Sequence, residues 1–124
     1  MLAGVIGPRH MVTAAHCIVN FGTTAWKTRV LTPGRDGPGI SPYGSTTITP
    51  NPAPGDTVWY FVPSQWTNPN TTNQWVWDWG MVVIPDYLGH QTGWMGYGAW
   101  SAGVLNNETH LNRGYPRCNV SNYT

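Results

Sequence analysis

Two residues of this sequence have the side-chain chemistry of an acid–base pair. His16 lies in the stretch VTAAHC (12–17), and Asp78 lies in VWDWGMVVI (76–84). Imidazole has an unperturbed pKa of about 6.5, so it suits proton transfer near neutral pH. A carboxylate fixes the tautomer of such an imidazole by accepting a hydrogen bond from its other ring nitrogen. We therefore expect His16 to be a general base and Asp78 its orienting carboxylate.

Only the fold can bring these two residues together, because they lie 62 positions apart. Small alanines at 14 and 15 allow a tight turn that would project His16 from the rim of a sheet. Trp77 and Trp79 flank Asp78 and would exclude water from its hydrogen bond.

Short apolar segments separated by glycine and proline predict an all-β protein with helix restricted to turns. A single helical turn is expected at AAHC (14–17), and long loops are expected at 33–42, 50–56 and 63–74. The expected strands are 2–7, 10–14, 26–32, 43–49, 57–62 and 76–84, with a weak one at 108–113.

Composition excludes several classes of function. The formal net charge is +1, with no basic stripe, which argues against nucleic acid or an anionic membrane as partner. No apolar run is long enough to span a bilayer. The histidines and cysteines lack metal-binding spacing and the five acidic residues are scattered, so we expect neither a metal nor another cofactor.

The segment GVIGPRHMVTAAHC (4–17) resembles the region around the catalytic histidine of chymotrypsin-like serine proteases. WDWGMVVI (77–84) resembles their second signature, and its spelling is closest to the glutamyl-endopeptidase (V8-like) branch. The stretches 61–74 and 93–98 are similar to that branch too, and NRGYP (112–116) is similar to the start of the second barrel.

The resemblance implies a two-barrel antiparallel fold that is incomplete at both ends of this chain. Residues 1–110 would form the first, six-stranded-type β-barrel with the catalytic His16 and Asp78, and residues 111–124 would begin the second barrel. The implied activity is hydrolysis of a protein or peptide substrate, with a preference for acidic residues taken from the branch alone.

The serine nucleophile that the resemblance requires has no candidate in this sequence. None of the five serines lies in a G-D-S-G context; they are Ser41, Ser45, Ser64, Ser101 and Ser121. Ser101 in AWSAG approaches the G-x-S-x-G elbow, but Glu108 and His110 follow too closely for that fold. The chain alone is therefore expected to be inactive, with the serine encoded downstream.

Cysteine and asparagine positions bear on the compartment. The resemblance implies an upstream partner for Cys17 where Met1 now stands; direct pairing of Cys17 with Cys118 is the alternative. The N-terminus lacks the features of a signal peptide. Four N-x-S/T sequons nevertheless favour a secreted, extracellular glycoprotein. These candidate glycosylation sites are Asn70, Asn107, Asn119 and Asn122.

A different class of function remains open, that of a non-catalytic binding module on a truncated protease barrel. Eight tryptophans are present, and Trp66, Trp94 and Trp100 lie in expected loops, where they could bind peptides or carbohydrates. The competing interpretation is that most tryptophans fill the core. A truncated barrel would also expose an edge and a face through which the chain could associate with a partner. The other histidines, His10, His90 and His110, match no motif.

Overall fold

The computed structural model describes residues 3–36, 38–50 and 58–110. Its strands are β1 (Ala3–Val5), β2 (His10–Thr13), β3 (Arg29–Leu31), β4 (Thr46–Ile48), β5 (Trp59–Phe61) and β6 (Gly80–Val83). Its helices are α1 (Ala15–Ile18), α2 (Ser64–Thr67), α3 (Leu88–Thr92) and α4 (Ala102–Asn107), with a 3-10 turn η1 (Gln74–Trp77). The all-β prediction is confirmed, because the strands form two antiparallel sheets and the helices of the described part are very short.

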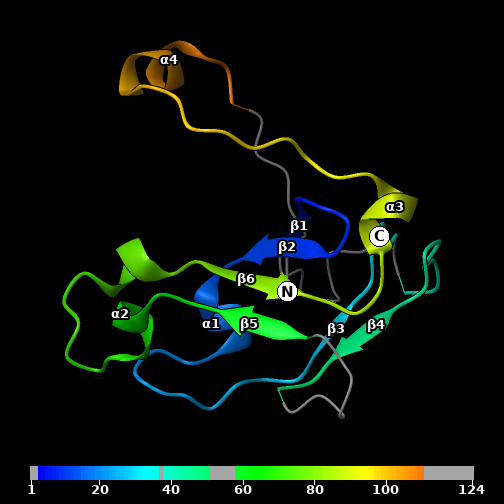
Figure 1. Cartoon of the computed structure of the whole chain (residues 1–124), viewed down its shortest axis with the longest axis horizontal. Coiled ribbons are helices and arrows are strands. Elements are labelled where there is room, and N and C mark those ends of the chain that lie inside the picture. Colours follow the sequence, from blue (N-terminus) through cyan, green and yellow to red (C-terminus); the bar gives the residue numbers. More distant parts are fainter. Residues whose placement is uncertain (1–2, 37, 51–57, 111–124) are drawn as a thin grey trace, which may run out of the picture.

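The strands form two antiparallel sheets (Figure 1). One has the order β1-β2-β6-β5, and the other is the β3–β4 pair. In the described part of the chain the two sheets do not close on each other. The expected first barrel is therefore present as an open, partial barrel.

The inner face of the four-stranded sheet carries the core because side chains alternate across each strand. Met11 and Thr13 of β2 are buried, while their neighbours His10 and Val12 are exposed. Val82 of β6 is fully buried beside them. Helix α1 supplies Ile18, which is also fully buried.

Gly80 allows β5 to approach β6 closely. A Cβ at this position would lie 2.8 Å from the carbonyl oxygen of Phe61 and 3.1 Å from the Ile18 side chain. A larger residue would therefore push β5 and α1 apart at the end of the sheet nearest Asp78.

Only the second half of the segment 76–84, expected to be a strand, forms one. Its first residues belong to η1, and the strand itself begins at Gly80. Asn73 precedes η1 with a left-handed φ of 54°, and the Asp78 N–H closes the turn by donating to the carbonyl oxygen of Trp75 at 3.4 Å. Local hydrogen bonding thus replaces a strand partner here.

The chain after β6 also differs from expectation. The segment before the weak strand expected at 108–113 forms α4, and residues 108–110 are not in a strand. Figure 1 shows α4 set apart from the sheets at the end of a long connection from α3. The segment 111–124, which was expected to begin the second barrel and includes the last part of the expected strand, lies outside the described residues. The boundary expected between the two barrels after residue 110 therefore stays a prediction.

The tryptophans contradict two expectations. Trp66, expected in an exposed loop, is only 2% exposed, and its indole N–H donates to the carbonyl oxygen of Val19 at 3.1 Å. The interpretation that most tryptophans fill the core is wrong, because five of the eight are exposed: Trp59, Trp75, Trp79, Trp94 and Trp100. The helical turn α2 is what carries Trp66 inward.

We predict that Trp66→Phe lowers the free energy of unfolding by about 1–3 kcal/mol, because it removes a buried ring and leaves the Val19 carbonyl without its donor. Trp75→Phe is the matched control, since Trp75 is 75% exposed, and it should change that free energy by less than about 0.5 kcal/mol. Urea unfolding measures both. Equal losses for the two variants would contradict the assigned core.

Candidate active site

His16 is positioned by a strand that runs directly into a helical turn. β2 ends at Thr13, and α1 begins two residues later at Ala15, which is fully buried. The Cys17 N–H donates to the Ala14 carbonyl oxygen at 3.0 Å, which closes the turn. The two small alanines therefore let the chain turn tightly, and the His16 side chain stays 59% exposed.

Asp78 makes two hydrogen bonds to His16. Its Oδ2 lies 2.7 Å from the imidazole Nδ1, and its Oδ1 accepts from the backbone N–H of His16 at 2.8 Å. The aspartate side chain is only 15% exposed, so water competes little for these bonds. The bond to the backbone N–H of His16 fixes the position of α1, and the bond to Nδ1 fixes the orientation of the imidazole ring.

This arrangement has a defined chemical consequence. A carboxylate that is ionised can only accept hydrogen bonds, so a neutral imidazole bonded to it through Nδ1 carries its hydrogen on that nitrogen. The lone pair of the neutral ring is then on Nε2, on the far side of an exposed side chain. Such a ring can take a proton from a hydroxyl group placed beside Nε2.

Two cationic residues that the sequence analysis did not single out stabilise the turn that carries His16. The Lys27 ammonium donates to the carbonyl oxygen of His16 at 2.8 Å, and the Arg29 Nε donates to that of Cys17 at 2.5 Å. Both therefore satisfy carbonyl groups at the end of α1, where the helix leaves acceptors free. The alternation at 26–32 predicted a strand. Lys27 and Arg29 lie two residues apart, so they were expected on one face of it, and this spacing was the sequence signal that could have identified their role.

Aromatic side chains line a hollow beside Asp78. A cavity of about 630 Å³ is bounded by Trp26, Tyr60, Trp77 and Trp79, among other residues. Tyr60 stacks on Trp26 with ring centroids 5.4 Å apart. Its hydroxyl is buried and has no hydrogen-bond partner among the residues that the structure describes. Burial raises the pKa of Tyr60 to about 12 despite the opposing effect of Arg29. Trp77 is half-buried as expected of a water-excluding neighbour, but Trp79 is 42% exposed.

The four described serines make no hydrogen bond with His16 or Asp78. Ser121 lies outside the described residues. Ser101 is the N-cap of α4, where its Oγ accepts from the Val104 N–H at 3.4 Å. It is a helix cap and not a nucleophile elbow.

The remaining histidines occupy other places. His10 lies on the exposed face of β2. His90 lies in α3, with its ring 5.3 Å from that of Tyr87 and 6.3 Å from that of Trp94. His110 has its Nε2 2.6 Å from the Leu105 carbonyl oxygen.

The candidate modification sites are only partly described. Asn70 and Asn107 are exposed, and Cys17 is half-buried and free of any disulfide within the described part. Asn119, Asn122 and Cys118 lie outside it, so neither their sequons nor the Cys17–Cys118 pairing is tested. The described ranges contain no cluster of three metal-ligating side chains and no helix long and apolar enough to cross a bilayer.

Comparison with solved structures defines the class of fold. A structure of a Glu endopeptidase in complex with MPD is similar with a TM-score of 0.55 and 20% identity, over 74% of this chain and 37% of that one. The open antiparallel sheet with His16 and Asp78 at its rim is thus part of a chymotrypsin-like protease fold.

Comparison of sequences finds a relative in the branch that the sequence resembles. A glutamyl endopeptidase of Bacillus licheniformis is 30% identical over 113 residues, which are 90% of this chain and 31% of the relative. The predicted resemblance to the glutamyl-endopeptidase branch is therefore confirmed. The chain spans about a third of the length of both relatives. No family model matches it.

We predict that Asp78→Asn moves the imidazole hydrogen of His16 from Nδ1 to Nε2, because the asparagine amide donates where the carboxylate accepted. Nitrogen-15 chemical shifts of the ring report the tautomer directly. Asp86→Asn is the matched control, since Asp86 accepts from the Thr46 hydroxyl and not from His16. An unchanged tautomer in Asp78→Asn would contradict the assigned geometry.

Proposed function

We propose that this chain supplies the general base and the orienting carboxylate of a secreted serine endopeptidase. The observation that carries the proposal is the double hydrogen bond of Asp78 to His16, which leaves Nε2 as the free nitrogen of an exposed ring. The similarity to a glutamyl endopeptidase over 90% of the chain supports the same reaction class.

The proposed chemistry is acyl transfer through a serine outside the described residues. His16 Nε2 takes the hydroxyl proton as the serine oxygen attacks the scissile carbonyl carbon, and the carbonyl π electrons move onto its oxygen. The imidazolium then gives that proton to the departing amine as the C–N bond breaks. Asp78 stays ionised throughout and stabilises the imidazolium. Water hydrolyses the acyl-enzyme by the same relay.

The substrate is a protein or peptide cleaved after an acidic residue, a preference that rests on the similarity to the glutamyl endopeptidase. We expect the serine and the oxyanion hole to be encoded within about 100 residues downstream, so the 124-residue chain alone is inactive. The exposed sequons Asn70 and Asn107 support a secreted protein.

The test uses the longer polypeptide with its downstream serine and the 124-residue chain in parallel, with a fluorophosphonate probe and a glutamyl peptide substrate. We predict labelling and hydrolysis only in the longer product, and a loss of about a million-fold in its kcat for His16→Ala. His10→Ala is the matched control and should keep full activity. Hydrolysis that survives His16→Ala, or a transcript that ends at a true stop codon without the serine, would contradict the proposal.

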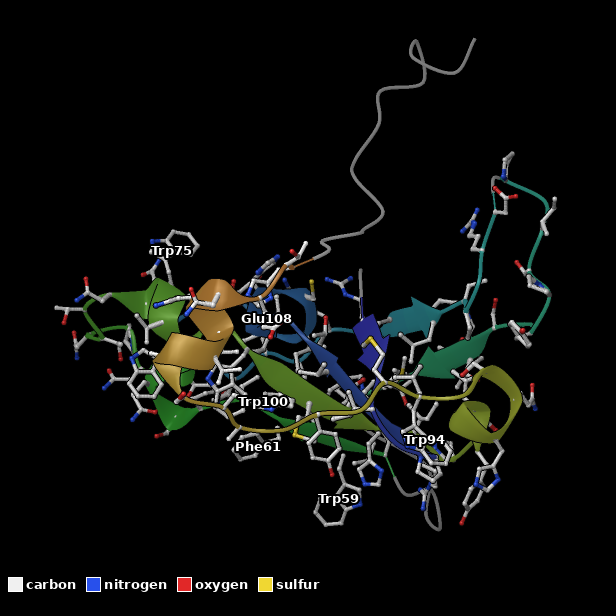
Figure 2. The ribbon with its side chains drawn as sticks, turned by 90° about the horizontal axis from the view of Figure 1, so that it is seen from above. Trp59, Phe61, Trp75, Trp94, Trp100 and Glu108 are labelled. Atoms are coloured by element: carbon white, nitrogen blue, oxygen red, sulfur yellow. The ribbon has the colours of Figure 1, made fainter. Side chains whose placement is uncertain are left out.

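A second candidate function, carbohydrate binding, is favoured by one surface of the sheet. Trp59 and Phe61 are 68% and 55% exposed and project from the same side of β5 (Figure 2). Trp79 lies beside Phe61, with ring centroids 5.7 Å apart. Flat, exposed aromatic faces grouped in this way suit stacking against sugar rings.

For this candidate we predict that the chain binds oligosaccharides immobilised on a glycan array. Trp59→Ala should lower the binding signal at least tenfold. Trp75→Ala is the matched control, because Trp75 is equally exposed but projects elsewhere (Figure 2). His16→Ala should leave binding unchanged, which separates binding from protease chemistry. An array without signal above background would exclude carbohydrate as the ligand.

A further inference from the structure

Three successive carbonyl groups of α1 accept hydrogen bonds from one segment further along the chain. The last carbonyl groups of a helix have no N–H of a following turn to accept from, so they need other donors. The Lys27 ammonium donates to the carbonyl oxygen of His16 at 2.8 Å, and the Lys27 backbone N–H donates to that of Ile18 at 2.8 Å. Between them, the Arg29 Nε donates to the carbonyl oxygen of Cys17. This segment therefore caps the turn that carries His16.

The capping segment is itself attached to the rest of the fold at both ends. Trp26 stacks on Tyr60 of β5 and forms an isolated backbone bridge with Val19. At the other end, Arg29 begins β3, which pairs with β4. Arg29 also acts electrostatically on Tyr60, where it opposes the rise in the pKa of the hydroxyl. Lys27 and Arg29 thus reach α1 from a segment whose place is fixed by both sheets.

Three of the four polar groups of His16 are held by charged side chains. Its backbone N–H donates to Asp78 Oδ1 at 2.8 Å, and its Nδ1 lies 2.7 Å from Asp78 Oδ2. Its carbonyl oxygen accepts from the Lys27 ammonium at 2.8 Å. Two side chains of opposite charge therefore hold opposite sides of one residue. Nε2, the nitrogen proposed to take the proton, is the group that they leave open.

The hold on the carbonyl group bears on the position of the ring. A helix of four residues is too short to be stable by itself, so α1 depends on contacts from outside it. A general base must lie within about 3 Å of the proton that it takes. A displacement of about 1 Å at a catalytic group can cost about a hundredfold in rate. A bond that prevents α1 from fraying is therefore able to control the rate without touching the substrate.

We propose that Lys27 is a positioning residue for His16. By holding the carbonyl group of His16, it keeps the imidazole against Asp78 and keeps Nε2 at a fixed place, and Arg29 supports the same turn through Cys17. This inference rests on the proposed role of His16 as the general base. Its structural part is testable without any proteolysis.

The first experiment uses the 124-residue chain and follows the proton on the His16 Nδ1 by NMR. Lys27→Met removes the ammonium but keeps most of the stem, and exchange of this proton with water should become at least about tenfold faster. Lys27→Arg keeps a cationic donor and should restore the exchange rate to within about twofold.

Arg9→Met is the matched control for this experiment. It removes the same charge and a bond of the same kind, because the Arg9 Nε donates to the carbonyl oxygen of Ile84 at 2.7 Å. Exchange of the Val82 amide, in an inner strand of the sheet, measures the stability of the whole fold in each variant. We expect Arg9→Met to leave the exchange of the His16 ring proton unchanged relative to that of Val82.

The second experiment uses the longer polypeptide with its downstream serine and the glutamyl peptide substrate. Lys27→Met should lower kcat about tenfold and leave KM within about twofold, because it moves the base and not the substrate. Lys27→Arg should recover most of kcat, and Arg9→Met should keep it. Hydrolysis that survives His16→Ala would contradict the proposed function, whereas the NMR comparison would still separate the Lys27 variants.

Three results would overturn the positioning role. One is an unchanged exchange rate of the His16 ring proton in Lys27→Met. Another is an equal acceleration in Arg9→Met, which would mean that the proton reports only the stability of the fold. The third is a loss of activity in Lys27→Met that appears in KM alone, which would place Lys27 in substrate binding.

Discussion

The Asp78 carboxylate, shared between the ring and the backbone of His16, is the contact on which the site depends. The register of β2 and β6 sets it, because Thr13 pairs with Gly80 at the end of both strands. His16 follows that pair by three residues and Asp78 precedes it by two. A shift of one residue in the register between β2 and β6 would exchange the buried and exposed faces of a strand. It would also separate the side chains of His16 and Asp78.

The features that could be predicted from the sequence are those that depend on local residue patterns, namely strands and turns. Short apolar segments located most strands, and the stretch around His16 indicated the turn that carries it. Features that only tertiary packing decides were missed. Residues 74–77 form η1, which is held by hydrogen bonds within the turn. Trp66 is buried because α2 turns it toward Val19. The hydrogen bonds from Lys27 and Arg29 form because residues 27–29 return beside α1; the spacing of the two cations was visible in the sequence, but the carbonyl groups that they reach were not.

The open barrel explains why so much apolar surface is exposed in so small a chain. The inner face of the four-stranded sheet is filled, whereas its outer face carries Trp59 and Phe61 uncovered. A closed barrel has no strand edge. Within the described ranges, β1 pairs with β2 alone among the strands and lies at the edge of its sheet.

The long connection to α4 has a consequence for local stability. No residue of α4 is buried, and the glycine-containing segment before it hydrogen-bonds to the sheet only through Met95 within the described residues. Loss of α4 would therefore expose almost no core, so its opening free energy is far below that of the sheet. A protease in the surroundings would cut first between Gly96 and Ser101, and the His16–Asp78 pair would survive the nick intact.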